Sequence, residues 1–215
     1  MTRNVKLSIG LIAAFAMVVG ALLVFGGGTA APGQAGPATS SAVRADSHRL
    51  STAADGKVTF VEFLDFECEA CGALYPAVEQ LRTEYAGRVT FVARYFPLPG
   101  HFNAERAARS VEAAAQQGRF EQMYQRMYET QAEWGEQQVP MDDRFRGYAA
   151  GLGLDMAAYD RAYADPATLA RINVDVADGT ALGVRGTPTL FLNGQKIEPR
   201  TYADLTSALD AALAS

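Results

Sequence analysis

The sequence has few of the residues that form disulfide frameworks, metal centres or nucleic-acid interfaces. Its 215 residues include only two cysteines and two histidines, which excludes a cysteine-rich disulfide scaffold. Lysine and arginine form no cluster, and the net charge is -5, so the basic surface that binds phosphate backbones is missing. A nucleic-acid partner is therefore excluded. Hydrophobic residues make up 49% of the chain, which is enough for a packed core of ordinary size.

Charged residues are also absent from a long stretch near the N-terminus. The apolar run Leu7–Phe25 follows Arg3 and Lys6, and no further charge occurs before Arg44. As a helix this run would measure about 28 Å, close to the thickness of the hydrocarbon layer of a bilayer. The preceding positive charges predict a cytoplasmic N-terminus and an exported remainder. We expect a single transmembrane helix that anchors the chain in the cell membrane. Cleavage of the run as a signal peptide, which would release a secreted protein, is the alternative.

The composition changes after this apolar run. Residues 26–50 are rich in glycine, alanine, proline and serine, which is typical of a flexible linker. We therefore expect three parts: a cytoplasmic start and membrane anchor over residues 1–25, a linker over residues 26–50, and one exported domain over residues 51–215.

The exported part begins with a strand, a helix and a second strand. Lys57–Phe66 is rich in β-branched and aromatic residues, Cys71–Tyr85 has apolar residues at helical spacing, and Arg88–Tyr95 reads as another strand. This order predicts a parallel pair of strands joined by a right-handed crossover. Residues 103–182 then predict an all-helical block, in which we interpret four aromatic side chains as core: Phe120, Tyr124, Tyr128 and Trp134.

The C-terminal part returns to strands. Asn193-Gly194 stands between Thr189–Leu192 and Gln195–Ile197, which predicts an antiparallel hairpin with a two-residue turn. Thr201–Ala214 has one apolar face and predicts a last helix.

The two cysteines form the sequence Cys68-Glu69-Ala70-Cys71, after the first predicted strand and at the start of the first helix. A disulfide that closes so short a loop stabilises a fold by only about 2 kcal/mol, which makes a purely structural clip a poor explanation. A structural zinc site needs four ligands, and the two histidines, His48 and His101, are distant in sequence from each other and from the cysteines.

A redox pair explains the position of the cysteines better. The unpaired amides and the positive end of the helix dipole favour a thiolate at Cys68. The thiolate is the attacking form in disulfide exchange. Cys71 lies one turn later on the same helix face and can resolve a mixed disulfide.

Further motifs accompany the cysteines. Glu62 precedes Cys68 by six residues, Pro76 follows it by eight, and the run Gly183–Thr189 (GVRGTPT) lies near the C-terminus. Together with the helical block, these motifs resemble the thioredoxin fold and, within it, the exported DsbA-like thiol-disulfide oxidoreductases. The resemblance covers the chain from about Lys57 to its end. It implies an α/β thioredoxin fold with an inserted all-helical subdomain, here preceded by the transmembrane helix.

The resemblance also implies the roles of the catalytic residues. Cys68 would be the sulfur that substrates attack, and Cys71 the resolving cysteine. Pro188 would follow a cis peptide bond and pack against the disulfide. Glu62 would be a buried acid that assists proton transfer to and from Cys71.

Substrate contacts are expected on both sides of Cys68. The backbone of Thr187 is expected to pair with an extended substrate segment, and Glu69 and Ala70 to contact the substrate. Glu69-Ala70 replace the Pro-His pair typical of strong oxidants, and Glu67 adds a second carboxylate. We expect these two carboxylates to make Cys68 less acidic than in the strongest oxidants.

The function implied is oxidation of exported cysteine-containing proteins during their folding. A membrane protein of the DsbB or VKOR type would reoxidise the enzyme, and no bound cofactor or metal is implied. A reductase or isomerase of the same fold and a non-catalytic tethered binding or chaperone module are the alternatives. His101 is interpreted as a turn or cap residue outside the site.

Overall fold

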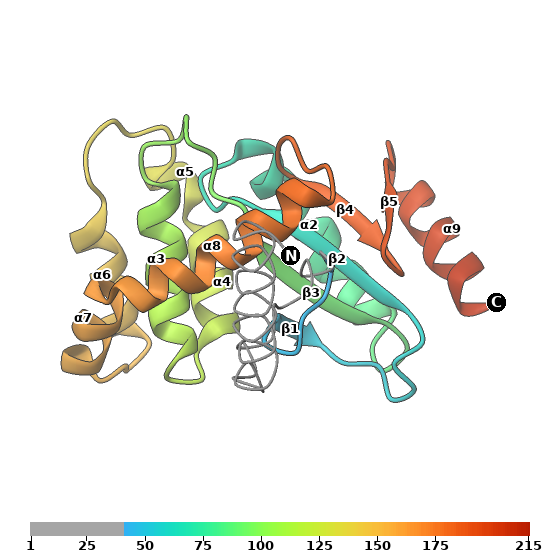
Figure 1. Ribbon diagram of the computed structural model, residues 1–215, viewed down its shortest axis with the longest axis horizontal. Helices are drawn as coiled ribbons and strands as arrows, with labels where there is room; N and C mark the ends of the chain where they lie inside the picture. The colour runs from blue at the N-terminus through green and yellow to red at the C-terminus, as the bar shows by residue number, and fades with distance from the viewer. Residues whose placement is uncertain (1–40) are drawn as a thin grey trace, which may run out of the picture. The chain divides into compact units, whose positions relative to one another are not determined.

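The computed structural model describes residues 41–215, in which a mixed sheet is flanked by helices (Figure 1). The expected transmembrane helix and most of the expected linker lie outside the described residues. Among the helices within residues 41–215, none is long and apolar enough to cross a membrane.

The sheet has five strands in the order β1-β3-β2-β4-β5. β2 and β3 are parallel, as predicted, and every other neighbouring pair is antiparallel. The hairpin between β4 and β5 is confirmed. Its two turn residues, Asn193 and Gly194, have φ angles of 49° and 79°, the positive values that a two-residue turn of this kind requires. The strands are β1 (His48–Ser51), β2 (Thr59–Leu64), β3 (Thr90–Tyr95), β4 (Thr189–Leu192) and β5 (Gln195–Ile197).

One helix crosses from β2 to β3, and the predicted helical block is inserted between β3 and β4. In Figure 1 the block lies at one end of the sheet, whereas the last helix lies beside β5 at the other. The helices are α2 (Glu69–Glu84), α3 (Ala104–Ala115), α4 (Phe120–Glu129), α5 (Gln131–Trp134), α6 (Asp142–Gly151), α7 (Met156–Ala164), α8 (Pro166–Ala181) and α9 (Tyr202–Leu213).

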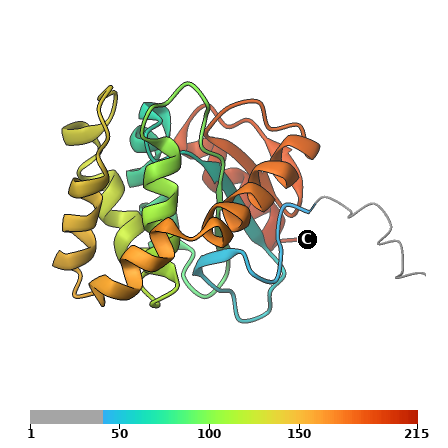
Figure 2. The same ribbon diagram turned by 60° about the vertical axis from the view of Figure 1, so that its left-hand side comes forward.

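The two faces of the sheet are covered by different helices. Phe60 and Leu64 of β2 pack in the cluster that includes α2 and α9. Val61 and Phe63 pack in the other cluster, on the face that α8 crosses (Figure 2). Because side chains alternate along a strand, Glu62 points to the same face as Phe60 and Leu64, under α2.

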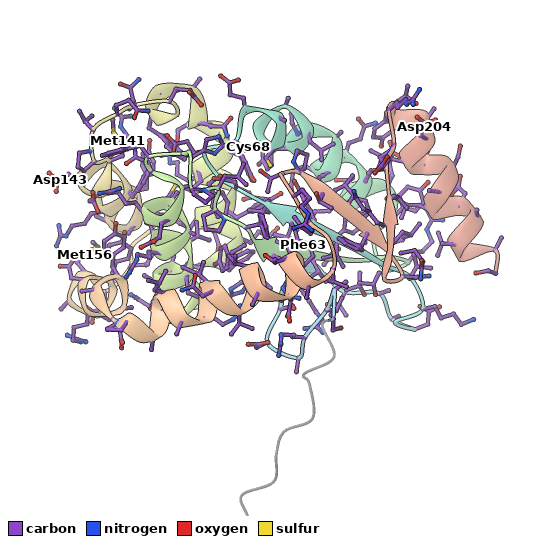
Figure 3. All side chains as sticks on the ribbon, turned by 45° about the horizontal axis from the view of Figure 1, so that its top comes forward. Phe63, Cys68, Met141, Asp143, Met156 and Asp204 are labelled. Atoms are coloured by element: carbon purple, nitrogen blue, oxygen red, sulfur yellow. The ribbon has the colours of Figure 1, made fainter. Side chains whose placement is uncertain are left out.

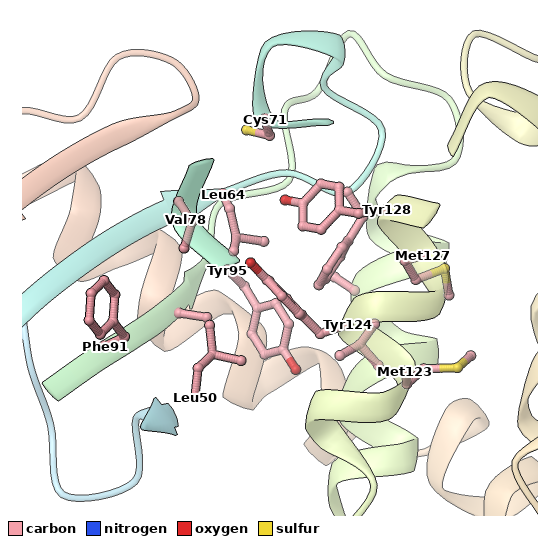
Figure 4. Packing of buried hydrophobic residues seen from close by; sticks show 14 of the residues in the cluster. Leu50, Leu64, Cys71, Val78, Phe91, Tyr95, Met123, Tyr124, Met127 and Tyr128 are labelled. Atoms are coloured by element: carbon pink, nitrogen blue, oxygen red, sulfur yellow. The ribbon is translucent and has the colours of Figure 1, made fainter. Parts of the chain in front are cut away.

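The aromatic residues of the helical block pack as core, as predicted. Tyr124 and Trp134 are fully buried and Tyr128 is 6% exposed. Figure 4 shows Tyr124 and Tyr128 of α4 directed toward Leu64 and Tyr95 of the sheet. This aromatic contact joins the inserted block to the two strands that flank α2, the helix that carries the cysteines.

The predicted end of the linker at residue 50 is wrong, because residues 41–50 belong to the folded part. β1 pairs with β3, and Arg44 forms an ion pair with Asp178 of α8. The fully buried Arg94 of β3 donates hydrogen bonds to two backbone carbonyls of this segment. Such a short, mostly polar edge strand lacks the apolar alternation that marks a strand in the sequence.

We predict that Asp178→Ala lowers the free energy of unfolding by about 2 kcal/mol, because buried Arg94 then loses one of its two carboxylate partners. Arg94 Nη2 lies 2.7 Å from Asp178 Oδ2, and Arg94 Nε lies 2.8 Å from Asp175 Oδ1. Urea unfolding followed by circular dichroism measures the change. The control is Asp160→Ala, which removes an exposed ion pair and should change stability little. Equal losses in both variants would contradict the prediction.

Candidate active site

The cysteine motif lies at the start of α2, with Cys68 as the residue that caps the helix and Cys71 in its first turn. Figure 3 places Cys68 close to the helical block. Neither thiol is in a disulfide. Cys68 is 7% exposed, whereas Cys71 is fully buried. The more accessible sulfur is thus the one predicted to react with substrates.

The pKa of the Cys68 thiol is lowered to about 5. The largest cause is a hydrogen bond from the Cys71 thiol, which stabilises the Cys68 thiolate. Burial opposes this shift, and the backbone N–H groups of Cys71 and Ala70 lower the pKa further. Amides at a helix start favour negative charge, as the sequence predicted. The value lies between those typical of the strongest oxidants, about 3.5, and of thioredoxin, about 7.

Cys71 has the opposite environment. Burial raises the pKa of its thiol, and the Cys68 sulfur and the Glu62 carboxylate raise it further. Burial likewise raises the pKa of Glu62 to about 8, with a contribution from the Cys68 thiolate. Glu62 is therefore protonated near neutral pH and close enough to influence both sulfurs, as a proton-relay acid would need to be.

The loop between α8 and β4 lies against Cys68. The Thr187–Pro188 peptide bond is cis, as the resemblance implies, and Cys68 Sγ lies 3.3 Å from the carbonyl oxygen of Thr187. A cavity of about 420 Å³ begins at Pro188 and extends between Leu74 of α2 and Tyr202 of α9. The structure thus places Thr187 and Pro188 beside Cys68.

The two carboxylates beside Cys68 do not act as expected. Glu67 is buried and its carboxylate accepts a hydrogen bond from the backbone N–H of Asn103 instead of facing the sulfur. Burial raises the pKa of Glu67, which favours its neutral form. Glu69 is exposed beside Ala70. Neither carboxylate is among the groups that chiefly set the Cys68 pKa, so the expected repulsion is not its main determinant.

Sequence reasoning missed a buried pair beneath the motif. Asp65 is 1% exposed and accepts hydrogen bonds from the backbone N–H groups of Glu67 and Leu98. Its Oδ2 also lies 2.6 Å from Nδ1 of His101. Burial opposes a charged imidazole, yet the contact with Asp65 raises the pKa of His101. His101 therefore belongs to the surroundings of the site, and no local pattern in the sequence indicated its partner.

Gln131 was missed as well. It lies at the start of α5 and donates hydrogen bonds to the carbonyl oxygens of Phe66 and Cys68, at 2.7 and 2.9 Å. Within residues 41–215, no group of three or more His, Cys, Asp or Glu side chains is placed to hold a metal ion.

A family model and a group of antiporters are similar to this chain. Residues 49–211 match the family model described as thioredoxin. The Na(+)/H(+) antiporter NhaA 1 of Mycolicibacterium gilvum is 36% identical over 164 residues, which cover 73% of this chain and 25% of the antiporter. The chain thus spans about a quarter of the length of the curated relatives it matches.

Solved structures share the fold. Oxidised BdbD from Bacillus subtilis superposes with a TM-score of 0.69 at 17% identity, covering 77% of this chain and 92% of BdbD. A thioredoxin-like oxidoreductase from Silicibacter pomeroyi gives a TM-score of 0.68 at 24% identity, covering 84% of this chain and 99% of that one. With the helical insertion and the cysteine pair at the start of α2, these matches identify the chain as a member of the thioredoxin family with the DsbA-like form of its fold.

Proposed function

We propose that this chain is an extracytoplasmic thiol-disulfide oxidoreductase that oxidises exported cysteine-containing proteins. One observation carries the proposal: the two thiols of the motif have opposite environments. The pKa of Cys68 is lowered to about 5, whereas burial raises that of Cys71. A structural disulfide needs no such difference, but a redox pair does, because one sulfur reacts with substrates and the other resolves.

The reaction proceeds by two exchanges. A substrate thiolate attacks Cys68 Sγ in the Cys68–Cys71 disulfide; a bond forms between the two sulfurs, and Cys71 leaves and takes a proton, for which Glu62 is the donor. A second substrate thiolate then attacks the substrate sulfur of the mixed disulfide and expels Cys68 as a thiolate. The substrate loses two electrons and gains a disulfide, and the enzyme becomes a dithiol.

The direction follows from the stability of the products. A thiolate stabilised at the start of α2 favours the reduced enzyme and therefore favours transfer of the disulfide to the substrate. Cys68 is also a good leaving group, because its pKa is lowered to about 5.

Substrate would bind as an extended segment along the loop that contains Thr187. The carbonyl oxygen of Thr187 lies 3.3 Å from Cys68 Sγ, which supports a role for this backbone in binding substrate beside that sulfur. Glu69 and Ala70 are exposed next to Cys68 and would contact the same segment. Recognition through backbone hydrogen bonds suits an enzyme that must accept many sequences.

The location and partners of the protein are part of the proposal. The apolar run Leu7–Phe25 supports a single membrane anchor with the catalytic domain outside the cytoplasm. Continued turnover then requires a membrane reoxidant of the DsbB or VKOR type to restore the Cys68–Cys71 disulfide. Sodium–proton exchange is not part of the proposal, because the match covers only about a quarter of the antiporters.

The test is the redox equilibrium of the full-length chain in glutathione buffers, read by mass spectrometry after acid quench and alkylation. We expect a midpoint potential above about -180 mV, which is the range of oxidising folding catalysts. A midpoint near about -270 mV would favour a reductase instead. Cysteines that do not exchange would favour a non-catalytic binding or chaperone module.

A further inference from the structure

Gln131 connects the inserted helical block to the backbone of the reactive cysteine. It is the first residue of α5, and its side-chain amide donates to the carbonyl oxygens of Phe66, at 2.7 Å, and Cys68, at 2.9 Å. An amide NH₂ has two donors, and both are used here. Because the two carbonyls lie on either side of Glu67, the amide fixes the peptide groups that lead into α2.

Gly72 provides the space for this contact. A Cβ atom at residue 72 would lie 1.9 Å from Oε1 of Gln131 and 2.8 Å from its Cδ, which is far inside van der Waals distance. Glycine within a helix costs about 1 kcal/mol relative to alanine. The close approach of Gln131 explains why the chain has glycine directly after Cys71.

We propose that Gln131 is a positioning residue for Cys68: it holds the first turn of α2 so that the backbone N–H groups of Ala70 and Cys71 point at the Cys68 sulfur. This inference rests on the proposed disulfide exchange at Cys68. The carbonyl of Cys68 accepts from Gln131 and, at 3.0 Å, from the backbone N–H of Gly72, the first hydrogen bond of the helix. Gln131 therefore reinforces the helix start on which thiolate stabilisation depends.

Other connections between the block and the motif do not reach the backbone of Cys68. Glu67 accepts from the backbone of Asn103, and Asp65 contacts His101. The hydroxyl of Tyr128 lies 3.4 Å from the backbone oxygen of Asp65. These contacts fix the preceding loop, whereas Gln131 binds the carbonyl of the reactive residue itself.

Charged groups approach Cys68 from several elements. Glu62 on β2 and His101 in the connection between β3 and α3 interact with the Cys68 sulfur, and Glu67 and Glu69 are its neighbours in the chain. Gln131 is neutral, so its replacement by alanine changes none of these charges. A change in the titration of Cys68 in that variant would therefore report the position of the backbone amides.

The first test is Gln131→Ala in the full-length chain, with the pKa of Cys68 read from the ultraviolet absorbance of the thiolate. We expect the pKa to rise by about one unit and the equilibrium constant for oxidising glutathione to fall about tenfold. The matched control is Gln117→Ala. Gln117 also makes two backbone hydrogen bonds within the helical block, both to Asp155, but does not touch the motif. It should leave both values unchanged.

A lower melting temperature with an unchanged Cys68 pKa and an unchanged glutathione equilibrium would overturn the proposal, because Gln131 would then only join the block to the sheet. If the alanine variant does not fold, Gln131→Met fills a similar volume without donors and is read in the same way. A parent chain that does not exchange with glutathione contradicts the proposed function, whereas a cycling parent with an unaffected variant contradicts this inference alone.

The second test uses the close contact with Gly72. Gly72→Ala should displace the Gln131 side chain and raise the Cys68 pKa as Gln131→Ala does. In the double variant the added methyl group has room, so the pKa should equal that of Gln131→Ala alone. Such non-additivity is expected of residues in direct contact. Additive shifts in the double variant would contradict the proposed contact.

Discussion

Replacing Cys68 by serine should abolish disulfide exchange, with a loss of at least about a thousandfold in the rate of oxidation of a dithiol peptide, because no disulfide can form and a serine hydroxyl is not ionised near neutral pH. Loss of the other cysteine should have an equal effect on this reaction, because it also prevents the disulfide. The rate is measured by the fluorescence change of a peptide whose two cysteines quench each other when joined. Measurable oxidation of this peptide by Cys68→Ser would contradict the proposed function.

Cys71→Ser is the matched variant, because it retains the acidic thiol and removes the resolving one. Its Cys68 thiolate should attack oxidised glutathione, release one reduced glutathione and form a stable mixed disulfide, detected as an added mass on the intact chain that dithiothreitol removes. The parent should not accumulate this adduct, because Cys71 displaces it. Absence of the adduct in Cys71→Ser would mean that Cys68 is not the attacking sulfur.

Much of the fold could be predicted from local sequence patterns. The strands around α2 show as β-branched runs, and the hairpin shows as Asn193-Gly194 between two short strands. The role of the cysteine pair could be predicted because two cysteines three residues apart at the start of a helix have few physical explanations. In each case the determining contacts lie close together in the sequence.

The parts that could not be predicted depend on contacts between distant residues. β1 is held by its pairing with β3, and residues 41 and 42 are held by the buried Arg94, whose partners the sequence does not indicate. Gln131 lies more than sixty residues along the chain from the residues whose carbonyls it binds. Its helix belongs to the inserted block, and the sequence of that helix does not indicate a contact with the cysteine motif. Asp65 and His101 are also far apart in the sequence, so the local pattern around His101 indicates only a turn.

Glu62→Gln should remove a pH dependence of stability. The pKa of Glu62 is raised from 4.5 to about 8 in the folded chain. Between these values the unfolded chain has already lost the proton that the folded chain keeps, so stability falls as pH rises. The loss amounts to as much as about 5 kcal/mol once pH exceeds the folded pKa. Urea unfolding of the oxidised protein, in which the Cys68 thiol cannot titrate, should therefore show a smaller difference between about pH 5 and about pH 8 in Glu62→Gln than in the parent.

The control for this comparison is Glu105→Gln, since Glu105 lies at the surface in an ion pair with Arg109. This variant should keep the pH dependence of the parent. In the reduced parent the lowered pKa of Cys68 opposes this effect, because the contribution of its thiolate to stability increases as pH rises. Identical pH dependence in Glu62→Gln and the parent would show that Glu62 does not hold its proton in the folded state.

The same substitution should slow catalysis while it stabilises the fold. Cys71 leaves the disulfide as a thiolate whose charge is disfavoured by burial, so it needs a proton. Glu62, with a pKa of about 8, holds a transferable proton near neutral pH, whereas glutamine holds none. We expect the attack of a reduced peptide on the disulfide to be about a hundredfold slower in Glu62→Gln at neutral pH, as measured by stopped-flow fluorescence. If the variant is more stable at alkaline pH and also slower, the buried acid serves proton transfer at the expense of stability. An unchanged rate would show that Glu62 takes no part in the chemistry.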